Sequence, residues 1–161
     1  MIILRSATPE DQPRITALIR AAGINPMDLK WQNFVLAVDD ATGAVVGTGQ
    51  IKTHKTDGSR ELASIATVPD YQKRGVATQI IQHFLAQEPG ALYLTCVPAM
   101  GVFYERFGFR RLNDSEMPTY YRRIKKLVKV FEVVKGEEQL LVMKREVGGQ
   151  KSEVGNLTSD L

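Results

Sequence analysis

Two adjacent cations and a glycine stand where an apolar run gives way to a helical pattern. The stretch is "YQKRGVA", residues 71–77, in which Lys73, Arg74 and Gly75 are consecutive. The first N–H groups of a helix have no partner within it, and the aligned peptide dipoles make that end partly positive. Gly75 lets a ligand approach the backbone closely. A phosphate or pyrophosphate would be stabilised there, although a solvated turn whose cations face water fits the local residues equally well.

Histidine and cysteine offer less chemistry. His54 adjoins a turn and His83 falls on the polar side of a helical pattern, so we expect solvated surface positions for both. Cys96 lies in an apolar run with no histidine nearby in sequence, which favours a buried structural thiol over a nucleophile. A single cysteine forms no intramolecular disulfide and gives no metal-type spacing, so we expect no metal.

Composition narrows the class of protein. A chain of 161 residues with 43% hydrophobic residues is long enough for one domain with a sizeable core. The net charge of +3 suits an anionic small ligand and is far from the dense cationic character of a nucleic-acid binder. The start resembles no signal peptide, and no apolar run approaches the roughly 20 residues that span a bilayer. We expect a soluble, cytoplasmic protein with no membrane segment and no nucleic-acid partner.

The surrounding elements alternate between strand and helix patterns. Apolar runs of β-branched type predict strands at residues 2–5, 34–40, 44–54, 61–68, 91–97, 109–112 and 139–146. Helical spacing predicts helices over 8–23, 75–87 and 98–108, with a second short helix at 27–32. The segment 118–135 is β-branched enough for a strand, but its apolar spacing favours a helix with a solvated basic face at 122–129.

This order predicts an α/β fold with a mixed, mostly antiparallel central sheet of six to seven strands and helices on both faces. We expect one domain over residues 1–147 and a flexible tail over 148–161, where apolar residues are sparse. The segment 113–138, between the last two strands, is expected to be a helical insertion.

A family resemblance bears on the loop. "VPDYQKRGVATQII" (68–81) resembles the acetyl-CoA-binding motif of the GNAT superfamily of N-acetyltransferases at Gln72, Gly75 and Ala77. Downstream, "VFYERFGF" (102–109) looks like the second signature of that family. The resemblance covers roughly residues 2–112 and the last strand. It implies an acyltransferase that uses acetyl-CoA, with an amino-acid acetyltransferase-like branch among the candidates.

The resemblance also implies a coenzyme site. The pyrophosphate is expected on the loop and helix start, at Gln72, Lys73, Arg74, Gly75, Val76, Ala77 and Thr78. The pantetheine arm is expected to pair with the backbone of the preceding strand, at Ile65, Ala66, Thr67 and Val68. The N–H of Val68 would then stabilise the oxyanion of the tetrahedral intermediate.

Two residues match positions that carry proton transfer in this family. Glu61 is the candidate base; strand alternation would place it on one side with Ala63, Ile65 and Thr67. Tyr104 is the candidate acid for the departing thiolate, since a free phenol has a pKa of about 10. The alternatives are a solvated glutamate beside Arg60 and a packing tyrosine.

The acceptor is less defined by the resemblance. A primary amine of a small molecule such as an amino acid is the first hypothesis; a protein or peptide amine, a non-catalytic acyl-CoA sensor and RNA binding follow. Val97 stands where many members carry asparagine, and segment 113–138 is long for the family and is expected to form a flap near the acceptor site or an interface. Trp31 lies near the segment that often lines the acceptor pocket, but core packing is favoured. The resemblance allows a homodimer.

Overall fold

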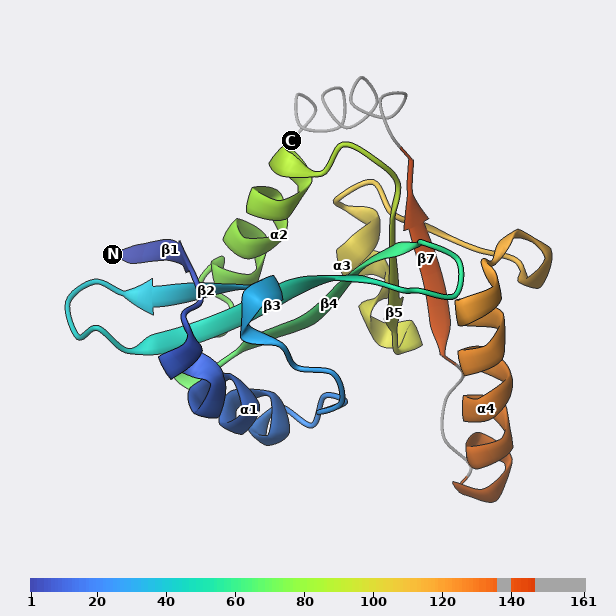
Figure 1. The fold of residues 1–161 in the computed structure, drawn as a ribbon, viewed down its shortest axis with the longest axis horizontal. Coiled ribbons are helices and arrows are strands. Elements are labelled where there is room, and N and C mark those ends of the chain that lie inside the picture. The colour runs from blue at the N-terminus through green and yellow to red at the C-terminus, as the bar shows by residue number, and fades with distance from the viewer. Residues whose placement is uncertain (136–139, 147–161) are drawn as a thin grey trace. The chain divides into compact units, whose positions relative to one another are not determined.

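The structure is a computed structural model that describes residues 1–135 and 140–146, with only the backbone described over 129–135. The strands are β1 (Ile2–Ser6), β2 (Phe34–Asp39), β3 (Val45–Thr53), β4 (Arg60–Thr67), β5 (Leu92–Cys96), β6 (Arg110–Arg111) and β7 (Leu141–Arg145). The helices are α1 (Gln12–Ala21), α2 (Val76–Gln87), α3 (Gly101–Glu105) and α4 (Thr119–Lys135). Figure 1 labels these elements, β6 excepted.

The seven strands follow the hydrogen-bonded order β1-β2-β3-β4-β5-β7-β6. Among the pairs whose register is described, β4 with β5 is parallel and the others are antiparallel. The predicted fold class, a mixed and mostly antiparallel α/β sheet, is therefore confirmed. The chain divides into two compact units, Met1–Lys52 with Leu62–Gln87 and Thr53–Glu61 with Glu88–Leu161.

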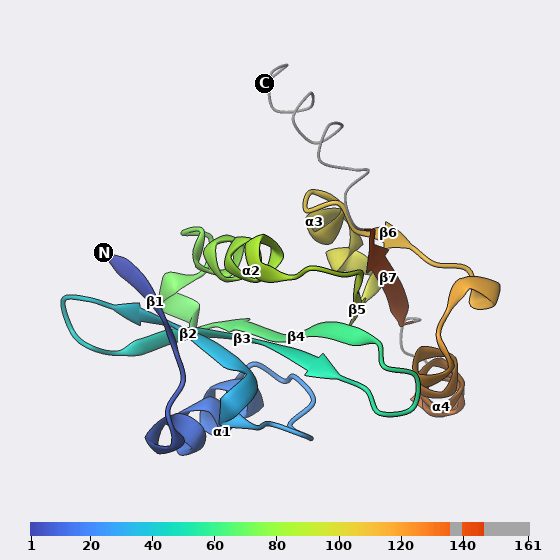
Figure 2. The same ribbon diagram turned by 45° about the horizontal axis from the view of Figure 1, so that its top comes forward.

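The first unit carries α1 and α2 on opposite faces of its strands (Figure 2). Alternate residues of β2 explain this arrangement. Phe34, Leu36 and Val38 join a buried cluster with Ile15 and Leu18 of α1. Helix α1 follows a 3₁₀ turn opened by Thr8, whose backbone N–H donates to Asp11 at 2.7 Å. Trp31 packs against the same cluster, as expected.

Helix α2 approaches β3 closely because two glycines stand beneath it. A Cβ on Gly47 would lie 2.7 Å from Val76, and one on Gly49 would lie 2.6 Å from Ile80. Such distances are too short for any larger residue without movement of the helix. The two glycines therefore fix how deeply the start of α2 sits on its strand.

The second unit is built around β5, which pairs with β7 over its whole length. Its buried cluster contains Leu112, Met117, Tyr121 and Val142. Segment 118–135 is a helix, as favoured, with Tyr121 fully buried and its basic residues Arg122 and Lys126 exposed.

Two smaller predictions have other outcomes. Residues 27–32 form no α-helix: a turn at 27–28 precedes a 3₁₀ turn over Trp31–Asn33. The side chain of Gln12 stabilises that path, since it donates to the Leu29 carbonyl at 2.8 Å and accepts from the Trp31 N–H at 3.0 Å. The tail expected over 148–161 lies outside the described residues.

Candidate active site

The loop between β4 and α2 exposes its backbone. After a 3₁₀ turn over Pro69–Tyr71, residues 72–75 form a turn and α2 begins at Val76. Lys73 has a φ of 60° and Gly75 a φ of 80°. A Cβ on Gly75 would meet no heavy atom within 4 Å. The positive φ explains the glycine, and the open space leaves this backbone accessible at the positive end of a twelve-residue helix.

Contacts within the first unit hold the loop in place. The Tyr71 hydroxyl donates to Asp39; this hydrogen bond lowers the pKa of Asp39 and raises that of Tyr71. The Arg74 guanidinium lies 4.7 Å from the centre of the Tyr71 ring. Gln72 donates to the Thr67 carbonyl at 3.1 Å. The exposed cations Lys73 and Arg74 therefore belong to a loop with a defined shape.

The remaining predicted phosphate contacts differ in exposure. Val76 is 1% exposed because its side chain packs over Gly47, so only its backbone is left for a ligand. Ala77 and Thr78 are half-buried. The structure thus brings the predicted loop residues together and limits Val76 to a main-chain role.

The end of β4 corrects the predicted oxyanion donor. The Val68 N–H donates to the Val46 carbonyl of β3 at 2.9 Å, so this donor is already used. Because consecutive N–H groups of an extended strand point to opposite edges, the Thr67 N–H points away from β3. Strand pairing decides which edge each N–H faces, and residue types alone do not predict that choice.

The regular alternation expected along β4 is also wrong. Ser64 has a φ of 57°, a left-handed conformation that interrupts the extended backbone. Its carbonyl accepts a hydrogen bond from Thr48 at 2.9 Å, and its hydroxyl accepts one from Gln50 at 2.8 Å. Strand alternation therefore does not predict that Ile65 and Thr67 lie on the same side of β4 as Glu61.

The first unit also contains a cavity of about 450 Å³ beside the end of β4. Arg14 is the one charged residue in its lining, and its guanidinium donates to the Val45 carbonyl at 3.2 Å. The lining comprises Arg14, Leu18, Ala21, Ala22, Ile24, Ile65, Ala66, Thr67, Val68, Pro69 and Gln72. All four residues predicted for the pantetheine arm therefore line the cavity, together with Gln72 at the start of the loop.

Glu61 lies in the second unit and is buried. Its side chain is 9% exposed, and Oε2 is 2.5 Å from Nε2 of His54, which is equally enclosed. The expectation that His54 is a solvated surface residue is wrong. The His54 N–H donates to the Ser59 carbonyl at 2.9 Å and closes the turn between β3 and β4. This turn places the imidazole of His54 beside Glu61. The alternative of a solvated glutamate is excluded by the same burial.

Two tyrosines of α4 enclose this pair. The Tyr120 ring stacks on the His54 ring with centroids 3.4 Å apart, and Tyr121 meets it edge-on at 5.8 Å. The Ser59 hydroxyl lies near the Tyr121 hydroxyl. Burial raises the pKa of Tyr121, and the negative charge of Glu61 raises it further. Sequence reasoning missed both tyrosines, since only packing of α4 brings them to the hairpin.

Tyr104 lies elsewhere in the second unit, next to Cys96. It is 9% exposed, and burial, with a smaller effect of Cys96, raises its pKa to about 12. Cys96 is only half-buried, against the expectation of a buried thiol; partial burial raises its pKa to about 11. Its Sγ lies 3.9 Å from Sδ of Met143. Tyr104 is therefore a phenol of raised pKa beside a thiol whose pKa is also raised.

Comparison with known proteins identifies the class. The sequence matches the family model described as "Acetyltransferase (GNAT) domain" over residues 30–111, which is 82 of 161 residues. The chain belongs to the GNAT family of acetyltransferases. A search of curated proteins found no match.

Solved structures share the fold. N-acetylglutamate synthase from Neisseria gonorrhoeae, complexed with coenzyme A and N-acetyl-glutamate, matches 92% of this chain with 20% identity and a TM-score of 0.70. This chain spans only 35% of that protein. Rv2747 from Mycobacterium tuberculosis, in complex with CoA and NLQ, has 18% identity over 91% of this chain and 99% of its own, with a TM-score of 0.70.

A third neighbour is the ribosomal-protein-S18-alanine N-acetyltransferase from Escherichia coli. It has 17% identity over 94% of this chain and 98% of its own, with a TM-score of 0.65.

Within the described part of this chain, no helix is long and apolar enough to cross a membrane. Over residues 1–135 and 140–146, no group of three or more His, Cys, Asp or Glu side chains is placed to hold a metal ion.

Proposed function

We propose that this chain transfers the acetyl group of acetyl-CoA to a primary amine of a small molecule such as an amino acid. The observation that carries the proposal is the loop over residues 72–75, where Lys73 and Gly75 adopt positive φ at the start of α2. That shape exposes consecutive backbone groups at a helix N-terminus beside two exposed cations, Lys73 and Arg74. A pyrophosphate is the coenzyme group that such a loop suits.

The residues around the cavity would hold the rest of the coenzyme. The backbone of Ile65, Ala66, Thr67 and Val68 would pair with the amides of the pantetheine arm. Because the Val68 N–H is bound to β3, we assign the oxyanion contact to the Thr67 N–H. A backbone donor of this kind is worth about 3 kcal/mol in the transition state, judged from oxyanion donors elsewhere.

Glu61 would take a proton from the acceptor, and Tyr104 would donate a hydrogen bond to the leaving group. The acceptor must lose a proton before it attacks, because an ammonium has no lone pair, and Glu61 is the proposed acceptor of that proton. Tyr104 has a pKa of about 12, above the ordinary thiol value of about 8.5, so full proton transfer to a thiolate is unfavourable. We therefore propose that Tyr104 stays protonated and donates a hydrogen bond to the departing thiolate.

The cavity favours a small acceptor with a negative group. Its volume of about 450 Å³ suits a small molecule together with part of the coenzyme, and its apolar lining carries one cation, Arg14. An amino acid presents both an amine and a carboxylate that could pair with such a cation. A peptide amine is the second candidate, because one structural neighbour is named for N-acetylation of an alanine of a ribosomal protein.

The test has two steps in one sample. Calorimetry measures acetyl-CoA binding, and free-thiol release is then followed with the standard amino acids and with a peptide that begins with alanine. The single cysteine, Cys96, contributes at most one thiol per chain, so release beyond that amount reports turnover. Binding with amino-acid-dependent release supports the proposal. Release with the peptide alone favours the second candidate, and absence of binding overturns both.

A further inference from the structure

Glu61 could accept a proton without a partner, but its carboxylate is held by the His54 ring. Both side chains are 9% exposed, and their facing atoms, Nε2 and Oε2, are 2.5 Å apart. A base that accepts a proton must be ionised, and an ionised carboxylate oxygen only accepts hydrogen bonds, so Nε2 carries the hydrogen of this contact. His54 therefore donates from Nε2 to one oxygen of Glu61 and leaves the other oxygen, Oε1, for a different proton.

The imidazole is fixed in this orientation by its surroundings. Tyr120 stacks on one face at 3.4 Å with an interplanar angle of 15°, and Tyr121 meets the ring at 88°. The backbone of His54 is bound on both sides of the hairpin turn, with the Gly58 N–H donating to its carbonyl at 2.7 Å. A ring held by stacking and by its own backbone can hold the carboxylate in turn.

The charged side chains that face the imidazole are both negative, which suits a ring N–H that donates to a carboxylate. They are Glu61 from β4 and Asp57 from the hairpin turn, while Tyr120 and Tyr121 of α4 present phenols. Asp57 accepts the backbone N–H of Tyr120 at 3.0 Å, which ties the turn to α4. Tyr93 of β5 stacks on Tyr121 behind the pair at 5.1 Å.

We propose that His54 is the positioning residue of the base: its Nε2–H holds Oε2 of Glu61 so that Oε1 takes the substrate proton. This inference rests on the proposed role of Glu61. In the step, an N–H bond of the substrate ammonium breaks, its electron pair stays on the amine nitrogen, and an O–H bond forms at Oε1.

Three substitutions separate positioning from packing. H54A removes both the hydrogen bond and the ring, and we expect kcat to fall at least about tenfold while KM for acetyl-CoA stays within about twofold. H54Q keeps an N–H donor at the place of Nε2 and should restore most of the lost kcat. In an E61Q background, H54A should cause no further loss, because its effect passes through Glu61.

The kinetics use thiol release from acetyl-CoA with the amine that reacts fastest, or with water if none reacts. H83Q, which alters the other histidine, a half-buried residue of α2, is the matched control and should change nothing. Equal losses from H54A in the presence and absence of Glu61 would overturn positioning. So would an H54Q enzyme that is as slow as H54A.

A spectroscopic experiment tests the position of the His54 proton even if no acceptor reacts. Nitrogen-15 NMR of the whole protein at pH 8 reports which ring nitrogen of each histidine carries the proton, and H83Q assigns the two. We expect the proton on Nε2 of His54, with a signal that changes in E61Q while that of His83 does not. A bare Nε2 contradicts the inference. A proton on Nε2 of His54 without any thiol release would support the inferred position of His54 and count against the proposed function.

Discussion

The loop over residues 72–75 and the cluster of His54, Glu61, Tyr120 and Tyr121 are two ways of building a polar site. The loop is exposed and offers main-chain groups, with one glycine in a conformation that other residues reach only under strain. The cluster is buried and depends on individual side-chain atoms, such as the Nε2 and Oε2 atoms that lie 2.5 Å apart.

The difference predicts separate failures. A main-chain site loses function when its backbone shape or its charge changes, and most side chains around it can vary. A buried side-chain site fails when one atom is replaced. Loop variants should therefore weaken coenzyme binding, whereas variants of the second unit should lower turnover with binding unchanged.

The largest effect is expected from G75E. The new carboxylate would stand where the pyrophosphate is proposed to bind, and two like charges 4 Å apart repel by about 4 kcal/mol at an effective dielectric constant of about 20. Acetyl-CoA affinity measured by calorimetry should fall more than about 100-fold. G43E is the matched control, because Gly43 has a φ of 72° and equally open surroundings. Similar losses in both variants would contradict the loop assignment.

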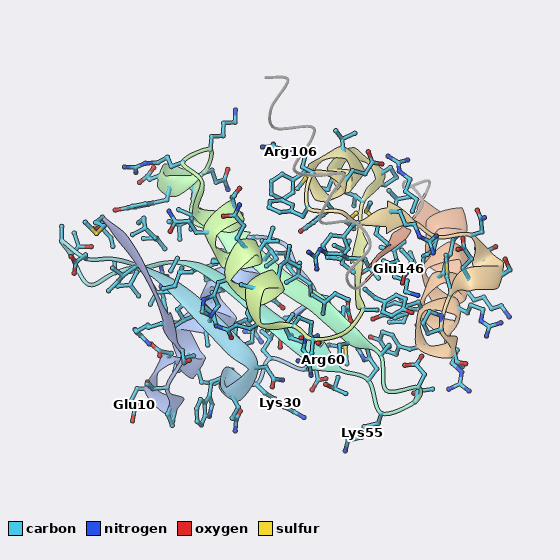
Figure 3. All side chains as sticks on the ribbon, turned by 90° about the horizontal axis from the view of Figure 1, so that it is seen from above. Glu10, Lys30, Lys55, Arg60, Arg106 and Glu146 are labelled. Atoms are coloured by element: carbon cyan, nitrogen blue, oxygen red, sulfur yellow. The ribbon has the colours of Figure 1, made fainter. Side chains whose placement is uncertain are left out.

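Substitution of the proposed base comes next. E61Q keeps the size of the side chain and removes its basicity, so kcat should fall about 100-fold or more with acetyl-CoA affinity unchanged. E88Q is the control, since Glu88 is also buried, with a side chain 4% exposed and 2.7 Å from Arg60, which Figure 3 labels. If E88Q lowered kcat as much as E61Q, the loss would come from structure, not from the base.

Replacement of Tyr104 should have a smaller effect. Y104F removes the proposed hydrogen bond to the thiolate, and such a bond to a charged group is worth about 1.5–3 kcal/mol, or about tenfold to 100-fold in kcat. Because the pKa of Tyr104 is raised to about 12, its acidic form persists throughout the working range. The rate profile of the unaltered protein should therefore show no fall due to Tyr104 up to about pH 10. A basic limb below that pH that is absent in Y104F would contradict this role.

The smallest effect is expected from Y71F. The variant loses the hydrogen bond to Asp39 but keeps the ring on which Arg74 stacks, so the pKa of Asp39 should rise toward its ordinary value. The loop should loosen slightly and acetyl-CoA should bind about two- to tenfold more weakly. Calorimetry of Y71F beside Y93F, a tyrosine variant in the second unit, checks this. Equal affinity in Y71F and the unaltered protein would remove Tyr71 from the loop's support.

The two regions also differ in how far the sequence predicts them. The loop is local: its glycine and the helix that follows are adjacent in the chain, so residue types alone predict a backbone open to an anion. Helix α4 was predicted in the same way, from the spacing of its apolar residues. Neither inference depends on contacts between distant segments.

The cluster depends on such contacts. His54 and Glu61 flank a turn that Asp57 and Gly58 predict, and a register drawn across that turn could have placed them together. The burial of His54 could not be predicted, because it comes from Tyr120 and Tyr121, which lie more than 60 residues further along the chain. The left-handed conformation of Ser64 and the strand edge that the Val68 N–H faces likewise depend on strand pairing.

The central claim is that this chain moves an acetyl group from coenzyme A to an amine. The most direct test incubates the protein with acetyl-CoA carrying a heavy-isotope acetyl group and the panel of amino acids, and weighs the products by mass spectrometry. We predict one or more N-acetylated amino acids in amounts equal to the thiol released, and about 100-fold less product with E61Q in the same time. Thiol release without any acetylated amine, or equal product with E61Q, would contradict it.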